Sequence, residues 1–228
     1  DILRVLHEHG IRGNGQAQTV PAKIEDGKVI CDFTGFDASI EWAMDQLHYN
    51  AFYLGPMFGG GTGAGWEKHH KWLGLDPLSE EFNRYFPEYM RQVGQHLREK
   101  GWLDNTWVYS NRDEPDAQTF LKENIPFCQM VHERYPGIRV YLASDGQADM
   151  AQGCDAWMTD LSASRYDPES QRHVKAPQLW HYYCHLPVRW QMRAPLVQAP
   201  NMQIDNPALE HRLAIWMSHC LGARAIFI

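Results

Sequence analysis

Hydrophobic residues recur along the chain with two spacings that alternate from one segment to the next. Large apolar side chains three and four residues apart, the period of an amphipathic helix, predict helices at 1–9, 36–49, 79–100, 116–135 and 207–221. Short apolar runs predict strands at 51–54, 106–110, 138–143, 155–158, 178–184 and 224–228, and residues 12–20 are a candidate for a seventh. Strands that alternate with helices in this way are typical of parallel β/α units.

The fold class predicted by this alternation is α/β, with a single (β/α)8 barrel of the TIM type over residues 1–228. Such a barrel usually takes about 250 residues. Because the chain opens within a predicted helix and stops on a predicted strand, we expect a barrel truncated at both ends, without its first strand and last helix. An open, doubly wound sheet is the alternative.

Individual residues refine the predicted helices. Asp37 is placed to cap the second of them. Pro87 should break or kink the third, and Pro126 should interrupt the fourth, because proline lacks the amide donor of a helical residue. In the last helix, an apolar stripe that should pack on the core is formed by Leu209, Leu213, Trp216 and Cys220.

Composition narrows the function classes. The chain has 228 residues, of which 44% are hydrophobic, enough for a full core. A net charge of −7 argues against a nucleic-acid partner, which calls for a basic face. No apolar run is long enough for a membrane span. The amino terminus does not resemble a signal peptide, and localisation stays open. Five dispersed cysteines indicate buried thiols, not a disulfide framework or a zinc site.

The strongest candidate for chemistry is the segment 107–115, a predicted strand followed by two acids and a proline. Strand alternation places Tyr109, Asn111 and Asp113 on one face, together with a tryptophan. Barrel active sites lie at the carboxyl ends of the strands, where Asp113 and Glu114 fall. Of two acids in one pocket, one stays ionised, and its charge keeps the other protonated and able to donate a proton. The alternative is that both acids only cap the following helix.

Other motifs give weaker signals. Twelve histidines invite a metal hypothesis, but His181 and His185, which could share a strand face, have no apparent third ligand. The glycine-rich segment 59–65 lacks the register of a nucleotide-binding loop. It is interpreted as a flexible loop at the barrel mouth, which could serve as a lid over a bound substrate. No cofactor is predicted.

The chain resembles the catalytic domain of glycoside hydrolase family 123, the β-N-acetylgalactosaminidases. The resemblance is carried by residues 9–11, 32–37, 100–102, 109, 113–115, 180–184 and 205–216, with Gly10 departing from the family's His-Arg-Ile. It implies retaining, substrate-assisted hydrolysis through an oxazolinium intermediate. Glu114 would be the general acid and then the base, and Asp113 would hold the N–H of the sugar's 2-acetamido group. It also suggests a periplasmic or secreted location and a glycan or glycoconjugate as the partner.

Aromatic residues supply further candidates for substrate binding, since nine tryptophans and ten tyrosines suit either a core or a sugar cleft. Alternation places Tyr183 with His181 on one face of the strand 178–184, and Trp180 with Tyr182 on the other. We expect Tyr183 to hydrogen-bond the acetamide oxygen. The full predicted binding set is Tyr183, Asn111, Tyr109, Trp157 (late in its predicted strand), Trp180, Tyr182 and Asp205, although Asp205 could equally cap the last helix.

Two other functions remain open. A carbohydrate-binding barrel without catalysis would keep the aromatic cleft and lose turnover. A metal-dependent hydrolase is the weaker alternative.

Overall fold

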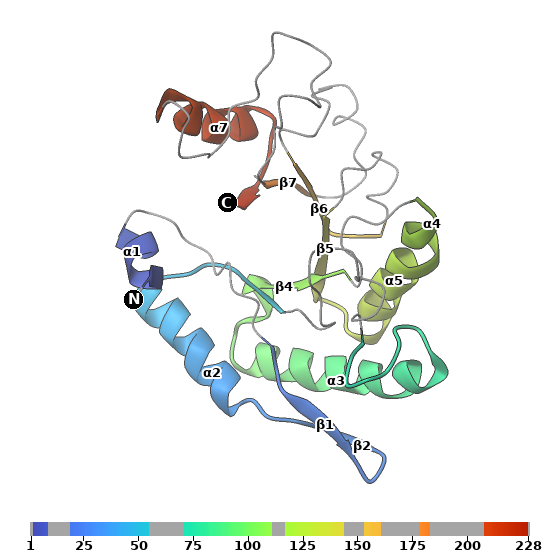
Figure 1. The fold of residues 1–228 in the computed structure, drawn as a ribbon. Coiled ribbons are helices and arrows are strands. Elements are labelled where there is room, and N and C mark those ends of the chain that lie inside the picture. The colour runs from blue at the N-terminus through green and yellow to red at the C-terminus, as the bar shows by residue number, and fades with distance from the viewer. Residues whose placement is uncertain are drawn as a thin grey trace. The chain divides into compact units, whose positions relative to one another are not determined.

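The computed structural model describes residues 2–8, 19–54, 71–110, 117–143, 153–160, 178–182 and 208–227 (Figure 1). The chain divides into two compact units. The first comprises residues 1–112 and 122–140, and the second comprises residues 113–121 and 141–228.

Six strands form one sheet in the order β3-β4-β5-β6-β7-β8, so that neighbours in the sheet are also neighbours in the chain. The pairs β3–β4, β5–β6, β6–β7 and β7–β8 are parallel. This confirms the α/β class and the six predicted strands. The bounds are Phe52–Leu54 (β3), Thr106–Tyr109 (β4), Arg139–Ala143 (β5), Ala156–Asp160 (β6), Gln178–Tyr182 (β7) and Ala225–Phe227 (β8). Of the seventh candidate, 12–20, only Thr19 and Val20 are described, and they lie outside any strand.

The helical segments occupy the predicted intervals between the strands. Their bounds are Ile2–Glu8 (α1), Thr34–Glu41 (α2), Trp42–Gln46 (η1, a π-helix), Glu80–Glu99 (α3), Leu103–Asn105 (η3, a 3-10 helix), Ala117–Thr119 (α4), Phe120–Asn124 (η4, a π-helix), Ile125–Arg134 (α5) and Ala208–Cys220 (α7). Pro126 lies in the first turn of α5, directly after the π-helical turn η4. The predicted interruption at Pro126 is therefore confirmed.

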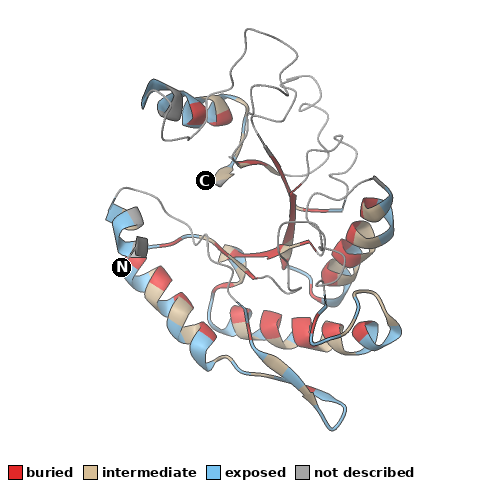
Figure 2. Cartoon of the chain, viewed as in Figure 1, coloured by how far each residue is buried: buried red, intermediate tan, exposed pale blue. Residues whose placement is uncertain are grey.

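Helix α3 is the main packing element of the first unit. Ser79 caps it, because its hydroxyl accepts a hydrogen bond of 3.2 Å from the amide of Phe82. Of the two outcomes predicted at Pro87, the break is wrong, since the helix continues through that residue, and the kink stays a prediction. An interior proline costs about 3 kcal/mol, and burial of one whole side of the helix offsets it. Figure 2 shows this buried side, which is formed by Phe82, Phe86, Tyr89, Met90, Val93 and Leu97.

An antiparallel hairpin that the sequence reasoning missed precedes α2. Its strands are Ala22–Glu25 (β1) and Lys28–Cys31 (β2). Asp26 and Gly27 join them with φ angles of 50° and 71°, which is the positive-φ pair of a two-residue hairpin turn. Tyr89 fastens the start of this segment to α3 by donating a hydrogen bond of 3.2 Å to the carbonyl of Val20.

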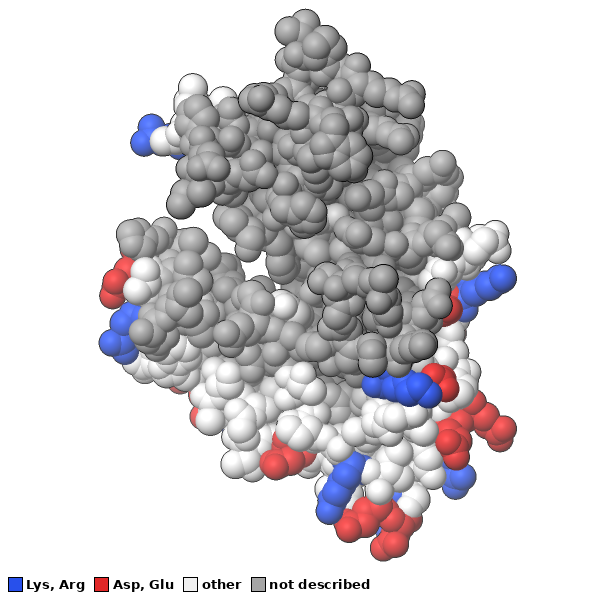
Figure 3. Space-filling model, viewed as in Figure 1, with Lys and Arg blue, Asp and Glu red and all other residues white. Residues whose placement is uncertain are grey.

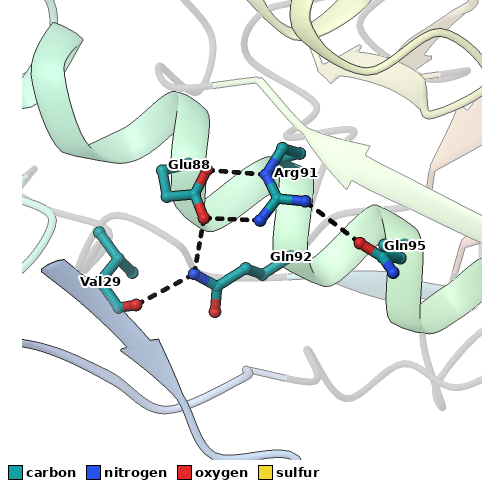
Figure 4. A network of polar contacts seen from close by, with 5 residues as sticks. All are labelled: Val29, Glu88, Arg91, Gln92 and Gln95. Carbon is teal, nitrogen blue, oxygen red and sulfur yellow. Dashed lines mark hydrogen bonds and ion pairs between the residues drawn. The ribbon is translucent and has the colours of Figure 1, made fainter.

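A polar network joins the hairpin to the outer side of α3 (Figure 4). Gln92 donates to the carbonyl of Val29 at 3.0 Å and to Glu88 at 2.9 Å. Arg91 donates twice to Glu88, at 2.7 and 2.8 Å, and these bonds lower the pKa of the Glu88 carboxyl. The side-chain amide of Gln92 therefore carries the helix-to-hairpin connection, while Glu88 and Arg91 hold that amide in place.

Asp37 does not cap α2, and this prediction is wrong. The helix begins at Thr34, whose amide donates to the Asp32 carboxylate at 3.0 Å. Asp37 instead pairs with His96 of α3 at 2.6 Å and with Lys100, the residue directly after α3, at 2.9 Å. Burial raises the pKa of Asp37, but the hydrogen bonds from Lys100 and His96 outweigh it, and the net pKa lies below its ordinary value. The Asp37 carboxylate thus links α2 to the carboxyl-terminal end of α3 instead of capping α2.

The predicted packing stripe of α7 is also wrong. Its four residues, Leu209, Leu213, Trp216 and Cys220, are all exposed, with Trp216 at 72%. The buried positions are the small residues Ala214 and Ser218. Ala214 packs with Ile226 of β8, with Met217 of α7 and with Leu221, which follows the helix. The buried side of the helix is therefore a different one from the predicted stripe. The expectation of buried thiols fails for Cys220, which is exposed, and is met by Cys128 and Cys154.

Charged side chains of both signs are intermingled on the described surface in Figure 3. Several are paired, as in Lys23–Glu25 at 3.0 Å and Lys71–Asp76 at 3.0 Å. No described helix is long and apolar enough to cross a membrane.

Gly94 gives a direct test of the packing of α3. A Cβ at this position would lie well inside van der Waals contact of the Tyr135 ring. We predict that Gly94→Ala lowers the free energy of unfolding by about 1–3 kcal/mol in urea titrations. The control is Gly35→Ala in α2, where nothing lies within 4 Å of the new Cβ and a gain of up to about 1 kcal/mol is expected. Adding Tyr135→Leu should restore part of the loss; equal stability of the two alanine variants would contradict the packing.

His181 in β7 gives a test of pH dependence. It is 0% exposed, neither ring nitrogen has a hydrogen-bond partner among the described residues, and burial lowers its pKa to about 4. Between pH 6.5, the ordinary pKa of histidine, and pH 4, His181 is protonated in the unfolded chain but stays neutral in the folded chain. We predict that this costs up to about 3 kcal/mol of stability between pH 6.5 and 4.

Urea titrations at pH 7, 5.5 and 4 measure the free energy of unfolding. The variant His181→Leu should not show the decrease in this free energy that protonation of His181 causes at acidic pH. The control His219→Gln changes an exposed histidine of α7 and should follow the native protein. Parallel stability curves for all three proteins would refute the assignment.

Candidate active site

The carboxyl end of β4 leads directly to the predicted catalytic acids. β4 ends at Tyr109, and Asp113 and Glu114 follow four and five residues later. Asn111, Asp113 and Glu114 lie outside the described residues, and their roles stay predictions.

One face of β3 and β4 is buried against helices. The register pairs Phe52 with Thr106 and Leu54 with Val108, and all four residues are at most 3% exposed. Phe52 meets the ring of Phe36 of α2 edge-on, with centroids 6.1 Å apart. The side chains that alternate with these therefore lie on the other face.

A buried hydrogen bond fixes the point where β4 ends. The side-chain amide of Asn124 donates to the hydroxyl of Ser110 at 2.7 Å. Asn124 is 0% exposed and Ser110 3% exposed. Because this bond is shielded from water, it holds the first residue after β4 against the end of η4. The segment with the two acids thus starts from an anchored position.

The other face of β3 and β4 is aromatic. It carries Tyr53 of β3, which pairs in register with Trp107 of β4, and Tyr109 one step further along β4. The Arg139 guanidinium lies 4.1 Å from the ring centre of Trp107, which is buried. Tyr53 and Tyr109 are less buried than the residues on the helix side. Aromatic side chains with partly accessible rings and hydroxyls suit contact with a sugar.

Tyr53 is a candidate that the sequence reasoning missed. It is the middle residue of β3, between two buried neighbours. The signal was available, since the central residue of a three-residue strand must point away from the face that both neighbours share. The register with β4, the strand that precedes the acids in the sequence, adds the second half of the argument.

In the second unit, Trp180 and Tyr182 share one face of β7, as predicted by alternation. Trp180 packs on Tyr141 of β5 with ring centroids 5.2 Å apart, and its indole N–H donates to Gln178 at 3.0 Å. Both rings of this pair are buried, while Tyr182 is half-buried near the carboxyl end of β7. The ring of Trp180 therefore packs within the protein, and Tyr182 is the more accessible of the two side chains.

Trp157 lies on the opposite face of the same sheet region. It pairs in register with Leu142 and Leu179, and it is 4% exposed. It is the second of five residues in β6, not late in the strand. The structure therefore does not bring Trp157 together with Trp180. His181 is on the side of Trp157, in register with Thr159 and Ile226.

The remaining predicted residues, Tyr183 and Asp205, lie outside the described residues, as do His185 and the glycine-rich segment 59–65. Among the residues that are described, no three His, Cys, Asp or Glu side chains gather in a way that could hold a metal ion.

The comparisons with known proteins agree with the sequence resemblance. A search of the curated proteins finds no match. Among solved structures, a family 123 glycoside hydrolase from Clostridium perfringens, whose structural analysis concerns glycolipid glycan hydrolysis, matches with a TM-score of 0.64 at 14% identity. The match covers 99% of this chain and 43% of that enzyme, and it shows a common fold. The family model of the glycoside hydrolase 123 catalytic domain matches residues 16–224. The chain therefore belongs to glycoside hydrolase family 123, by its catalytic domain.

Proposed function

We propose that this chain is the catalytic domain of a retaining glycosidase that cleaves β-linked N-acetylgalactosamine with the help of the substrate's own acetamide. The observation that carries the proposal is family membership across residues 16–224, a range that contains β4 and the Asp113–Glu114–Pro115 sequence after it. In the proposal, the six-stranded sheet is part of a (β/α)8 barrel that forms a single catalytic domain. The partner is a glycan or glycoconjugate.

The proposed first step uses both acids on one sugar. Glu114 gives its proton to the glycosidic oxygen as the bond to the anomeric carbon breaks. The acetamide oxygen of the same sugar attacks that carbon and forms an oxazolinium ring. Asp113 accepts a hydrogen bond from the acetamide N–H, and its negative charge stabilises the positive ring. Water then opens the ring, with Glu114 as the base, and the configuration at the anomeric carbon is retained.

Chain geometry favours this chemistry over the ordinary retaining mechanism. An ordinary retaining enzyme needs two carboxyl groups about 5–5.5 Å apart that flank the scissile bond. Consecutive residues have Cα atoms about 3.8 Å apart and are poorly placed to reach opposite sides of one bond. They can serve one edge of a sugar whose acetamide acts as the nucleophile. An internal nucleophile is already positioned, which lowers the entropic part of the barrier.

A panel of chromogenic substrates tests the function. We expect cleavage of the β-N-acetylgalactosaminide, no cleavage of the plain β-galactoside, inhibition by a thiazoline analogue of the oxazolinium ring, and no effect of chelators. A β-N-acetylglucosaminide in the same panel measures the selectivity at one hydroxyl. Saccharide binding without turnover would instead support the carbohydrate-binding barrel. Loss of turnover with a chelator would support a metal-dependent hydrolase.

The roles of the acids have their own test. We predict that Glu114→Gln lowers kcat/KM by about 10²–10⁴-fold on substrates with poor leaving groups and much less on activated aryl glycosides, because only the former need a proton donor. Asp113→Asn should lower kcat on both classes, because the ring charge develops in each. Matched controls are Asp104→Asn, exposed near the opposite end of β4, and Glu133→Gln, exposed on α5. Unchanged turnover of a natural glycan by Glu114→Gln would refute the acid assignment.

A further inference from the structure

We propose that Tyr53 is a substrate-binding residue that contacts the saccharide beside Tyr109. This inference rests on the proposed function, and it adds a residue of β3 to the set that binds the sugar. It comes from the register of two strands in the first unit.

The position of Tyr53 follows from backbone pairing. Tyr53 pairs with Trp107, so the same face of the sheet presents Tyr53 on β3 and both Trp107 and Tyr109 on β4. Adjacent strands lie about 4.8 Å apart, and side chains on diagonal positions are within reach of aromatic rings. Tyr53 and Tyr109 therefore form neighbouring parts of one aromatic wall.

The direction of the strands places this wall at the edge of the sheet from which the chain continues toward the predicted acids. β3 and β4 are parallel, so their carboxyl ends lie at the same edge of the sheet. The segment with Asp113 and Glu114 leaves β4 at that edge, from the anchored residue Ser110. Ligands of parallel β/α sheets bind at the carboxyl ends of strands, which is where a sugar held by these acids would meet the wall.

The partial exposure of its side chain distinguishes Tyr53 from a tyrosine of the core. On the helix side, Phe52 is 3% exposed and Leu54 1% exposed, whereas Tyr53 between them is only partly buried. Along β4 the same change occurs, from buried Trp107, covered by Arg139, to half-buried Tyr109. An accessible tyrosine offers a flat apolar face to sugar C–H groups and a hydroxyl to sugar oxygens.

The test measures binding and turnover in parallel. Titration calorimetry with N-acetylgalactosamine gives Kd, and the chromogenic β-N-acetylgalactosaminide gives KM and kcat, for the native protein, Tyr53→Ala and Tyr53→Phe. We expect Tyr53→Ala to raise Kd and KM about tenfold. Native-like binding by Tyr53→Phe assigns the contact to the ring, and weakened binding assigns it to the hydroxyl; either result supports the proposal. The controls are Tyr85→Ala and Tyr85→Phe, which change a half-buried tyrosine of α3 that lies under Arg84.

Thermal unfolding checks that each variant is folded. If Tyr53→Ala is unstable, Tyr53→Leu replaces it, since leucine keeps apolar bulk and removes both ring and hydroxyl. Native Kd and KM in the Ala or Leu variant would overturn the role of Tyr53 and leave the proposed function intact. A native protein that neither binds nor cleaves an acetamido sugar would overturn the proposed function and this inference with it.

Discussion

The parallel pairing of β3 with β4 is the constraint on which the candidate site depends. Once Phe52 is in register with Thr106, every neighbouring side chain is assigned to a face. The apolar residues and the small polar residues Thr106 and Ser110 go to the helix side, where they are almost fully buried. Tyr53 and Tyr109 are left on the other face. A slip of β3 by one residue would turn Tyr53 to the helix side and expose Phe52 and Leu54, and the loss of burial makes that arrangement unfavourable.

A second constraint acts at the end of β4. Ser110 and Asn124 form a buried polar pair in a region that is otherwise apolar. A buried polar group costs free energy unless it is hydrogen-bonded, so the pair specifies one arrangement of the strand end and η4. The π-helical turn at Phe120–Asn124 precedes Pro126, which cannot donate an amide hydrogen bond. The widened turn and the proline thus set the place from which Asn124 reaches Ser110, and so the point where the acid-bearing segment begins.

The sequence predicted the elements of this fold well where a long periodic pattern met a clear stop. The six strands and the helices between them lie where the spacing placed them. It failed where two interactions compete for one residue. Asp37 could cap a helix, but its carboxylate pairs instead with His96 of α3 and with Lys100 directly after α3. Pro87 carries a local penalty, and the buried side of α3 outweighs it.

The same limit applies to orientation. In α7 the larger apolar side chains form the more regular stripe, yet the buried positions are Ala214, which packs on Ile226 of β8, and Ser218. Periodicity shows that a helix has an apolar side, but only the partner surface decides which side is used. For the site, alternation correctly paired Trp180 with Tyr182 and separated both from His181. It separated Tyr53 from Phe52 and Leu54, but the importance of that separation became visible only with the register of β3 against β4.

The proposed role of each of the two acids likewise depends on a neighbouring group. A lone Glu114 near neutral pH would be ionised and could not donate a proton. In the proposed mechanism, an ionised Asp113 beside it would disfavour a second negative charge and keep the Glu114 proton in place. The acetamide N–H would then give Asp113 a partner that becomes more acidic as the oxazolinium forms, so that the attraction would grow along the reaction and lower the barrier instead of merely tightening binding. Under the proposal, adjacency of the acids, anchoring of the strand end and an aromatic wall for the sugar are therefore three parts of one arrangement, and each is of little use without the others.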